Sequence, residues 1–343
     1  MKIKRLGRTE LSVAENGFGA LPIQRISRDD AAALLRRAYD GGINFYDTAR
    51  FYTDSDEKIG YALGGVRKDI LIATKSMGRD KRTALEHLET SLRNLKTDYV
   101  DIFQLHNIPA LPDVNNEESD HYALLEAKRS GKCRFIGITT HRLDVAVAAA
   151  KSGLYDTIQF PLSYLSTPDE LALIDLCREQ DLGVIAMKAM SGGLISSPEA
   201  AFAFLRGYDN LIPIWGVQRM RELEDFLSYA ERETPLDERL LAAMERDRAE
   251  LQGNFCRGCG YCQGGCPAGI EISNAARMIL MLRRAPWQEY TTPAWREKMK
   301  KINDCIGCGA CRRRCPYGLD CPTLLRENYA DYEQFCREHG LEF

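Results

Sequence analysis

The sequence predicts an α/β protein in which a closed (β/α)8 barrel, the TIM-barrel fold, precedes a small and mainly α-helical domain. Two observations support this fold class. Short apolar segments alternate with helical segments eight times before about residue 231, and ten of the twelve cysteines lie at or after residue 256. Outside a small secreted chain, such crowding of cysteines indicates metal ligands rather than disulfide bonds.

The alternation follows a regular order along the chain. The predicted strands are residues 13–23, 44–49, 70–75, 99–106, 133–140, 157–163, 183–189 and 211–217. The predicted helices are residues 28–42, 57–65, 83–95, 122–131, 143–153, 169–180, 198–207 and 221–230. The strand segments are apolar and β-branched, as parallel strands buried on both faces are. Glycines end most of the helices. Strict alternation favours a parallel sheet, and eight units favour its closure.

An open, doubly wound sheet is the competing fold. Such a sheet would carry a G-x-G-x-x-G turn after its first strand. The segment GFGALPI at residues 17–23 does not supply that turn. The sequence therefore favours the closed barrel.

The pattern changes after Ala230. Residues 231–253 form a polar connector with helical character, and the cysteine-rich region follows it. We therefore expect the barrel domain over residues 1–240 and the cysteine-rich domain over residues 241–343.

Composition narrows the classes of partner. The chain has 45% hydrophobic and 28% charged residues, and its formal net charge of −3 gives no reason to expect nucleic acid. No apolar run approaches the roughly 20 residues that span a bilayer. The opening MKIKRLGRTELSV lacks the apolar region of a secretory signal. We expect a cytoplasmic protein without a membrane partner.

Four polar side chains follow consecutive predicted strands. Asp47 and Tyr52 follow the second strand, Lys75 ends the third and His106 ends the fourth. Barrel enzymes place their chemistry at the carboxyl ends of the strands. Each residue alone has an ordinary structural explanation, such as a packed tyrosine or a solvated rim lysine. Their joint arrival at one rim indicates a catalytic site.

These residue types suit carbonyl reduction. A hydride that reaches a carbonyl carbon leaves negative charge on the oxygen, which needs a proton donor. A phenol with a pKa of about 10 is a weak acid near neutrality, and a nearby Lys75 cation would favour its phenolate. Asp47 would hold that lysine, and His106 could donate a hydrogen bond to the carbonyl oxygen.

The barrel region resembles the aldo-keto reductase superfamily. The resemblance lies in GINFYDTARFYTDSDEKIGYAL at residues 42–63 and in RLGRTELSVAENGFGAL at residues 5–21. It covers roughly residues 1–230. The catalytic tetrad that it implies is Asp47, Tyr52, Lys75 and His106.

The same resemblance implies a nicotinamide dinucleotide, NADP(H) or NAD(H), bound across the barrel mouth. Asp47 would lie near the nicotinamide ribose, and Gln159 would bind the carboxamide with help from Thr139, Thr140 and His141. Met187 stands where many members stack an aromatic ring on the nicotinamide. The segment Ser191, Gly192, Gly193 and Leu194 resembles the family's glycine-containing loop beside the pyrophosphate.

The adenosine end of the cofactor would meet the segment WGVQRMRELED, residues 215–225. By the resemblance, Arg221 would grip the 2′-phosphate of NADP(H) and Glu224 would lie near the adenine. The family's preceding Lys-Ser pair is replaced here by Trp215 and Gly216. Two of the residues that contact the 2′-phosphate in the family are thus missing. The resemblance favours NADP(H) over NAD(H) only through Arg221.

Two cysteine runs share the spacing C-x2-C-x2-C-x3-C-P, which is typical of [4Fe–4S] proteins. The first run is Cys256, Cys259, Cys262 and Cys266, and the second is Cys305, Cys308, Cys311 and Cys315. In this pattern three close thiolates hold one cluster and the fourth reaches the other. We expect Cys315 to join the first three cysteines and Cys266 to join the other three. Structural zinc is the alternative, but zinc modules usually offer two separated C-x2-C pairs.

Residues 271–285 and 293–302, between the two runs, have helical periodicity. The region therefore resembles the α-helical ferredoxin domain of fumarate reductase and succinate dehydrogenase iron–sulfur subunits more than a compact β-rich ferredoxin. The remaining cysteines, Cys133, Cys177, Cys321 and Cys336, are expected to be packing thiols.

Two functions from different classes fit this sequence. The first is an enzyme, an NAD(P)H-dependent reductase of aldehydes or ketones with a fused two-cluster domain. The second is an electron-transfer protein whose barrel binds or senses the nicotinamide cofactor while its clusters pass electrons to a redox partner protein. A hydride carries two electrons and a cluster accepts one, and no flavin motif is present to divide the pair. A regulatory, non-catalytic barrel is a third reading, against which the intact tetrad speaks.

Overall fold

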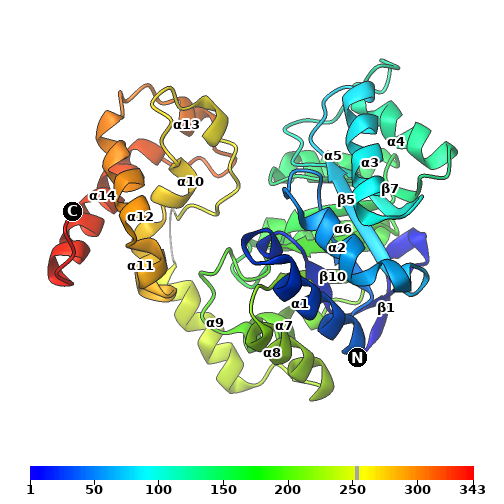
Figure 1. Ribbon diagram of the computed structural model, residues 1–343, viewed down its shortest axis with the longest axis horizontal. Coiled ribbons are helices and arrows are strands. Elements are labelled where there is room, and N and C mark those ends of the chain that lie inside the picture. Colours follow the sequence, from blue (N-terminus) through cyan, green and yellow to red (C-terminus); the bar gives the residue numbers. More distant parts are fainter. Residues whose placement is uncertain (252–254) are drawn as a thin grey trace. The chain divides into compact units, whose positions relative to one another are not determined.

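A computed structural model describes residues 1–251 and 255–343 of the chain (Figure 1). The chain forms two compact units. The first contains Met1–Ala189 and Pro198–Leu240, and the second contains Met190–Ser197 and Leu241–Phe343. The segment 190–197 therefore belongs to the second unit, although both of its flanks belong to the first. Gln252 and Gly253, which end the predicted connector, lie outside the described residues.

Eight parallel strands within residues 1–251 close into a barrel, which confirms the predicted fold class (Figure 1). The strands are β3 (Gly17–Gly19), β4 (Phe45–Asp47), β5 (Leu71–Ser76), β6 (Val100–Leu105), β7 (Cys133–Thr139), β8 (Thr157–Pro161), β9 (Gly183–Met187) and β10 (Leu211–Gly216). They pair in chain order, and β10 pairs with β3 to complete the ring. The helices between and after them are α1 (Arg28–Asp40), α2 (Ser55–Leu63), α3 (Lys81–Leu95), α4 (Asp120–Arg129), α5 (Leu143–Ser152), α6 (Pro168–Glu179), α7 (Pro198–Arg206) and α8 (Met220–Glu231).

Side chains at several helix starts satisfy backbone N–H groups that the helix leaves open. Helix α6 begins with a capping box: the Thr167 hydroxyl accepts from the Glu170 N–H, and the Glu170 carboxylate accepts from the Thr167 N–H. The Asp80 carboxylate caps α3 in the same way by accepting from the N–H of Thr83 at 2.8 Å. These two local signals fix where α3 and α6 begin.

The second unit is mainly helical, as predicted. Its helices are α9 (Glu238–Glu250), which begins in the first unit, α10 (Ile272–Ala275), α11 (Met278–Arg284), α12 (Pro293–Lys300), α13 (Ala310–Arg314) and α14 (Cys321–Glu338). The sequence analysis did not predict α14. Its buried residues Cys321, Leu325, Tyr332 and Cys336 recur at helical spacing and form one face. The expectation that Cys321 and Cys336 are packed, like Cys133 and Cys177 in the barrel, is confirmed by their burial.

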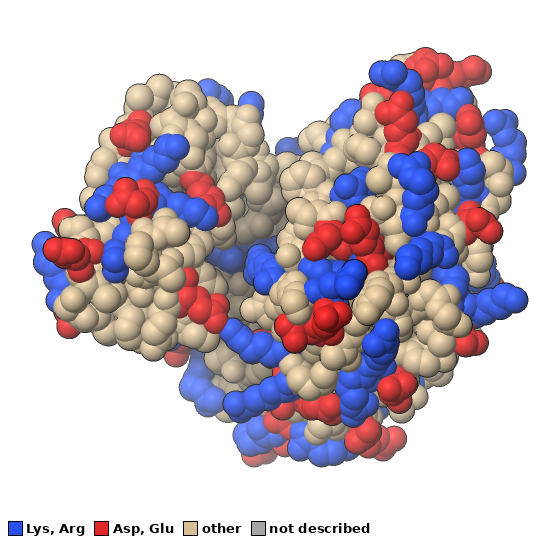
Figure 2. Space-filling model, in the orientation of Figure 1, with Lys and Arg blue, Asp and Glu red and all other residues tan. Residues whose placement is uncertain are grey.

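The surface carries both signs of charge. Figure 2 shows Lys and Arg side chains interspersed with Asp and Glu over the visible face. Among the described residues, no helix combines the length and the apolarity needed to cross a membrane.

The barrel interior holds a fully packed apolar layer. Alternate residues of a strand share a face, so every second strand residue points inward. The buried cluster formed in this way contains Leu6, Leu11, Val13, Phe45, Ala73, Ile102, Ile185, Ile212 and Ile214, with Met187 packed against it. This layer separates the two ends of the barrel.

An N-terminal hairpin, which the sequence analysis did not predict, supplies part of that layer. Strand β1 (Ile3–Arg5) pairs antiparallel with β2 (Ser12–Ala14). The predicted first strand, residues 13–23, was therefore wrong in extent. Its start belongs to β2, and only Gly17–Gly19 enters the barrel. The three-residue strands are too short for a periodic signal to separate them.

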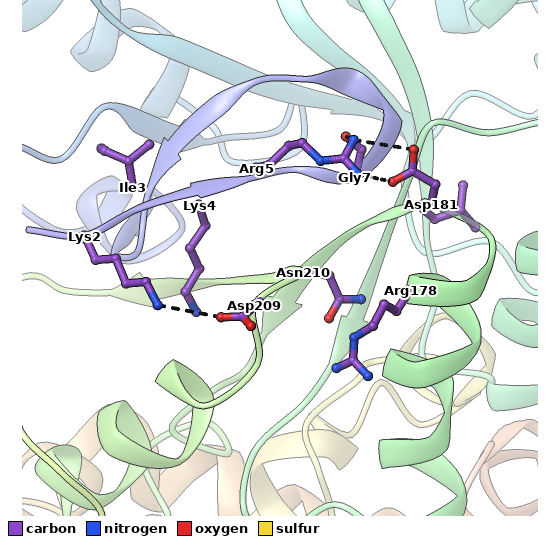
Figure 3. A pocket seen from close by; sticks show the side chains of 10 residues that line it. Lys2, Ile3, Lys4, Arg5, Gly7, Arg178, Asp181, Asp209 and Asn210 are labelled. Carbon is purple, nitrogen blue, oxygen red and sulfur yellow. Dashed lines mark hydrogen bonds and ion pairs between the residues drawn. The ribbon is translucent and has the colours of Figure 1, made fainter.

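A polar hollow lies beside this hairpin (Figure 3). Two ion pairs lie within its lining: Lys2 with Asp209 at 3.6 Å and Arg5 with Asp181 at 2.5 Å. Lys4 Nζ donates to the carbonyl oxygen of Tyr208 at 2.7 Å. Asp181 and Asp209 precede β9 and β10, so the hollow lies at the amino ends of the strands. That face of a barrel serves stability rather than chemistry.

We predict that alanine substitutions at two glycines, both with a left-handed backbone, lower the free energy of unfolding by very different amounts. Gly7 has φ +51°, and a Cβ on it would lie 2.3 Å from the backbone nitrogen of Gly183. Gly131 has φ +75°, and a Cβ on it would meet nothing within 4 Å. We expect Gly131→Ala to cost about 1 kcal/mol of unfolding free energy from backbone strain alone. Gly7→Ala should cost at least about 3 kcal/mol, because backbone must also move.

Urea unfolding of the two variants measures this difference. Equal losses would show that the hairpin turn does not pack on β9 as described.

Candidate active site and cluster sites

A polar layer lies at the carboxyl ends of the strands, next to the apolar layer. Asp47, Lys75 and Gln104 each come two residues after a member of the core cluster on β4, β5 and β6. Side chains two residues apart on a strand lie on the same face. These three side chains therefore point into the barrel interior as well, one layer nearer the barrel mouth. In the register, Lys75 lies opposite Gln104.

Lys75 and Asp47 form a buried ion pair in this layer. Lys75 Nζ lies 2.6 Å from Asp47 Oδ2 and donates a second bond, also 2.6 Å, to the carbonyl oxygen of Thr48. The two side chains are 1% and 2% exposed. Burial raises the pKa of Asp47. Burial is the largest single effect on Lys75 and lowers its pKa, but Asp47, Tyr52 and Asp56 together outweigh burial and raise the pKa of the lysine. Lys75 therefore stays cationic.

Tyr52 lies in the turn between β4 and α2, close to this cation. The centroid of its ring is 5.1 Å from Lys75 Nζ. Burial raises the pKa of Tyr52, and Lys75 lowers it by less. The predicted effect of Lys75 on the phenol is thus present, but it is smaller than the effect of burial. Tyr52 remains a protonated phenol near pH 7.

His106 follows β6 and completes the group. Its ring meets that of Tyr52 edge-on, with centroids 5.7 Å apart. Burial lowers the pKa of His106 well below its ordinary value, and the Lys75 and Arg79 cations lower it further. The imidazole is therefore neutral near pH 7 and carries one N–H to donate. The structure thus brings all four residues of the predicted tetrad together.

Several buried polar atoms of this layer lack a hydrogen-bond partner among the described residues. They are Asp47 Oδ1, Gln104 Oε1 and His106 Nδ1. Buried polar groups are bonded in the great majority of cases. The donor and acceptor set at the mouth therefore fits a polar ligand, such as a nicotinamide nucleoside with a carbonyl compound.

Gln104 is a site residue that the sequence analysis missed. Its Nε2 donates to Gln159 Oε1 at 2.9 Å, and Gln159 Nε2 lies 3.4 Å from Asp47 Oδ2. It thereby orients the predicted carboxamide ligand. The available signal was a lone amide in the apolar strand VDIFQL, two residues before His106.

The other predicted cofactor residues from β7 and β9 also lie at the carboxyl ends of their strands. The Thr139 hydroxyl accepts from the N–H of Asn107 at 2.7 Å, and the Thr140 hydroxyl donates to the carbonyl of Ile108 at 2.9 Å. His141 is buried, and Met187 is partly buried against the core. Their contacts with a cofactor stay a prediction.

The two residues predicted for the adenosine end lie on α8. Arg221 is exposed on its first turn. Glu224 forms a two-bond ion pair with Arg37 of α1, at 2.7 and 2.8 Å. In this structure Glu224 thus ties two helices together, and its contact with adenine stays a prediction.

The first predicted group of cysteines lies together in the second unit. Burial raises the pKa of the Cys262 thiol to about 12, and the neighbouring thiols of Cys256, Cys259 and Cys315 act in the same direction. Cys259 likewise responds to Cys256 and Cys315. Cys315 thus accompanies the first run although it belongs to the second in sequence, as the predicted grouping requires.

The second predicted group lines one hollow. Cys266, Cys305, Cys308 and Cys311 border about 360 Å³ of empty space, some of it open to solvent, with Ile270, Leu325 and other apolar residues. Within the described chain, no three His, Cys, Asp or Glu side chains are arranged around a single metal ion. In a cubane cluster each thiolate binds a different iron, and binding of such a cluster by these four cysteines stays a prediction.

Comparisons with known proteins find one family match in the barrel region and another in the cysteine-rich region. Residues 15–203, more than half of the chain, match the Aldo/keto reductase family, and residues 255–320 match a 4Fe-4S dicluster domain. The chain belongs to the aldo/keto reductase family. It is an oxidoreductase of that family joined to a 4Fe–4S dicluster domain.

The known proteins that are similar to this aldo/keto reductase align with its barrel part. An L-galactose dehydrogenase of Arabidopsis thaliana is 33% identical over 218 residues, which span 57% of this chain and 67% of that protein. The holo form of aldo-keto reductase AKR11C1 from Bacillus halodurans shares the fold with a TM-score of 0.63 at 24% identity, over 72% of this chain and 96% of its own. A Klebsiella pneumoniae aldo-keto reductase in complex with NADPH gives a TM-score of 0.61 at 22% identity, over 71% and 94%.

The grouping of thiols predicts unequal effects for two neighbouring cysteines. Cys315→Ala removes the fourth thiolate of the first group, so the reconstituted protein should hold roughly half of the iron of the unaltered chain. Cys321→Ala, in which all eight cysteines of the two runs remain, should keep the full content. Iron and sulfide analysis with EPR of the reduced protein measures both. Full iron content in the Cys315 variant would refute the grouping.

Proposed function

We propose that this chain reduces the carbonyl group of an aldehyde or ketone, with NADPH, or alternatively NADH, as the reductant. The observation that carries the proposal is the buried Asp47–Lys75 pair, which keeps a cation beside the Tyr52 phenol and a neutral His106. When bound, the nicotinamide cofactor would supply the hydride. Negative charge then develops on the carbonyl oxygen, and this chain has to stabilise and protonate it.

Tyr52 is the proton donor in this proposal. Its raised pKa keeps the phenol protonated at neutral pH. The nearby Lys75 cation stabilises the phenolate that remains after the proton leaves, which lowers the cost of transfer. Lys75 thus acts on the transition state more than on the resting tyrosine.

His106 orients the substrate. A neutral imidazole can donate one hydrogen bond to the carbonyl oxygen without giving up a full proton. Burial and the two nearby cations keep it neutral. Asp47 balances the charge of Lys75 and keeps its second carboxylate oxygen for a ribose hydroxyl.

The remaining cofactor contacts follow the resemblance. Gln159, with Thr139, Thr140 and His141, would hold the carboxamide, and Met187 would pack on the nicotinamide ring through its polarisable sulfur. The backbone N–H groups of the segment 191–194 would face the pyrophosphate. Arg221 supports NADP(H) through a 2′-phosphate contact.

We propose that the domain over residues 241–343 holds two [4Fe–4S] clusters through the eight cysteines of its two runs. Clusters exchange single electrons, so a redox partner protein, if the clusters pass electrons onward, accepts them one at a time. The substrate of the barrel is a small carbonyl compound, and the interspersed surface charges give no footprint for nucleic acid.

Removal of the Tyr52 hydroxyl tests the assignment of the proton donor. Tyr52→Phe should lower kcat for aldehyde reduction by about a hundredfold to ten-thousandfold, while the Kd for NADPH changes by less than about twofold. Tyr61→Phe, on the exposed side of α2, should leave both unchanged. NADPH oxidation with a panel of simple aldehydes measures kcat. Unaltered turnover by Tyr52→Phe would exclude this function for the barrel.

The pKa directions predict a flat pH profile. Tyr52 must be protonated to act, and its raised pKa keeps it protonated until the pH exceeds about 10. His106 must be neutral, and because its pKa lies well below the ordinary value of about 6.5, it is neutral at any pH above that ordinary value. The kcat for reduction should therefore stay constant between about pH 6.5 and about pH 9. A midpoint near pH 7 would contradict the assigned states.

A further inference from the structure

One arginine of the second unit lies against two glycine segments that are far apart in sequence. Arg277 follows α10. A Cβ on Gly192 would lie 2.5 Å from Arg277 Nη1, and a Cβ on Gly258 would lie 3.1 Å from the same atom. The guanidinium therefore lies against the backbone at both positions, and a side chain at either one would have to displace it. Gly258 stands between Cys256 and Cys259 of the first cysteine run.

The segment 190–197 is also fastened to the second unit at its other end. Asp247 of α9 is buried and accepts from the Ser196 N–H at 2.8 Å and from the Ser196 hydroxyl at 2.7 Å. Arg284 of α11 pairs with Asp247 at 2.9 Å and donates to the carbonyl oxygen of Leu194. Both side chains of this pair are at least nine-tenths buried. Such charge-assisted bonds hold the loop backbone firmly.

The loop needs this support because Ser191 is strained and two glycines follow it. Ser191, Gly192 and Gly193 all have positive φ, at 48°, 68° and 92°. For a residue with a side chain, the left-handed region costs about 1–2 kcal/mol. Only Ser191 bears that cost, because glycine adopts positive φ freely, but two adjacent glycines lose much conformational freedom when the loop is ordered. The supporting groups are Arg277 at one end of the segment and the Asp247–Arg284 pair at the other.

The position of Arg277 also has an electrostatic consequence. Its Nε and Nη1 atoms are buried. A cluster held by the thiolates of Cys256, Cys259 and Cys262 carries net negative charge, and so does a pyrophosphate. A guanidinium that packs between the first cysteine run and the glycine segment is attracted by both anions.

We propose that Arg277 is a positioning residue that couples occupancy of the first cluster to the affinity of the chain for NADP(H). The proposal rests on the proposed function, which assigns the segment 191–194 to the pyrophosphate. With the first cluster bound, the Cys256–Cys259 segment holds Arg277 against Gly192, and the loop keeps its left-handed turn. Without the cluster, that segment no longer holds Arg277, and the loop relaxes.

The test uses the full chain with clusters reconstituted anaerobically, and NADPH as the probe. Arg277→Met keeps the length of the side chain and removes its charge. At full iron content it should weaken NADPH binding about tenfold, within the range of typical couplings between sites. The change should appear in KM for NADPH and not in kcat. Arg277→Lys, which restores the charge, should recover most of the affinity.

Arg283→Met is the matched control. Arg283 lies on α11 beside Arg284, but it pairs with Asp331 of α14 at 2.6 and 2.8 Å and not with the segment 190–197. The NADPH affinity of the Arg283→Met variant should equal that of the unaltered chain. Removal of the clusters by a chelator should weaken NADPH binding to the unaltered chain about tenfold. The same treatment should leave the NADPH affinity of Arg277→Met unchanged.

A loaded Arg277→Met variant with normal NADPH affinity would overturn the proposal, and so would an unaltered chain that binds NADPH equally with and without clusters. Binding of neither NADPH nor NADH to the loaded, unaltered chain would overturn the proposed function as well. If Arg277→Met fails to assemble clusters, the unaltered chain with and without clusters decides alone: equal NADPH affinity in the two states overturns the proposal.

Discussion

A ring of eight parallel strands encloses a space that side chains must fill, and this constraint determines where each functional group of the barrel can lie. Only every second residue of a strand points inward. The inward positions therefore stack in layers, and an apolar residue in one layer fixes the direction of the residue two positions later. Phe45 places Asp47, Ala73 places Lys75, and Ile102 places Gln104. The hairpin between β1 and β2 supplies the residues that fill the other end.

Burial then gives these groups their chemical properties. The Lys75 ammonium and the Asp47 carboxylate would each be costly to bury alone, and each is tolerated because the other is 2.6 Å away. The same exclusion of water that raises the pKa of Tyr52 lowers that of His106. One cause thus leaves both groups uncharged, and Lys75 is the cation beside them; in the proposed reaction it would stabilise the developing negative charge. Such fixed charges in a water-poor site need little reorganisation during a reaction.

Much of this arrangement could be predicted from the sequence, because the barrel strands carry strong local signals. Continuous apolar segments placed the strands, and polar residues at their ends placed the tetrad. The short strands β1 and β2 carry no such signal, since three residues cannot show a period. Gln104 escaped notice because a single amide in an apolar strand resembles an ordinary buried residue. The attachment of residues 190–197 to the second unit depends on Asp247 and Arg284, which no local pattern connects to that loop.

The fastening of the segment 190–197 has a consequence for synthesis of the chain. Ser196 precedes its partner Asp247 by 51 residues, and Leu194 precedes Arg284 by 90. At a translation rate of about 5–20 residues per second, roughly 5 to 20 s pass between the appearance of the loop and that of its last anchor. The strands of the barrel are complete before then. The barrel strands therefore leave the ribosome while the segment 190–197 is still unanchored, and that segment acquires its shape only when the C-terminal part has been made and folded.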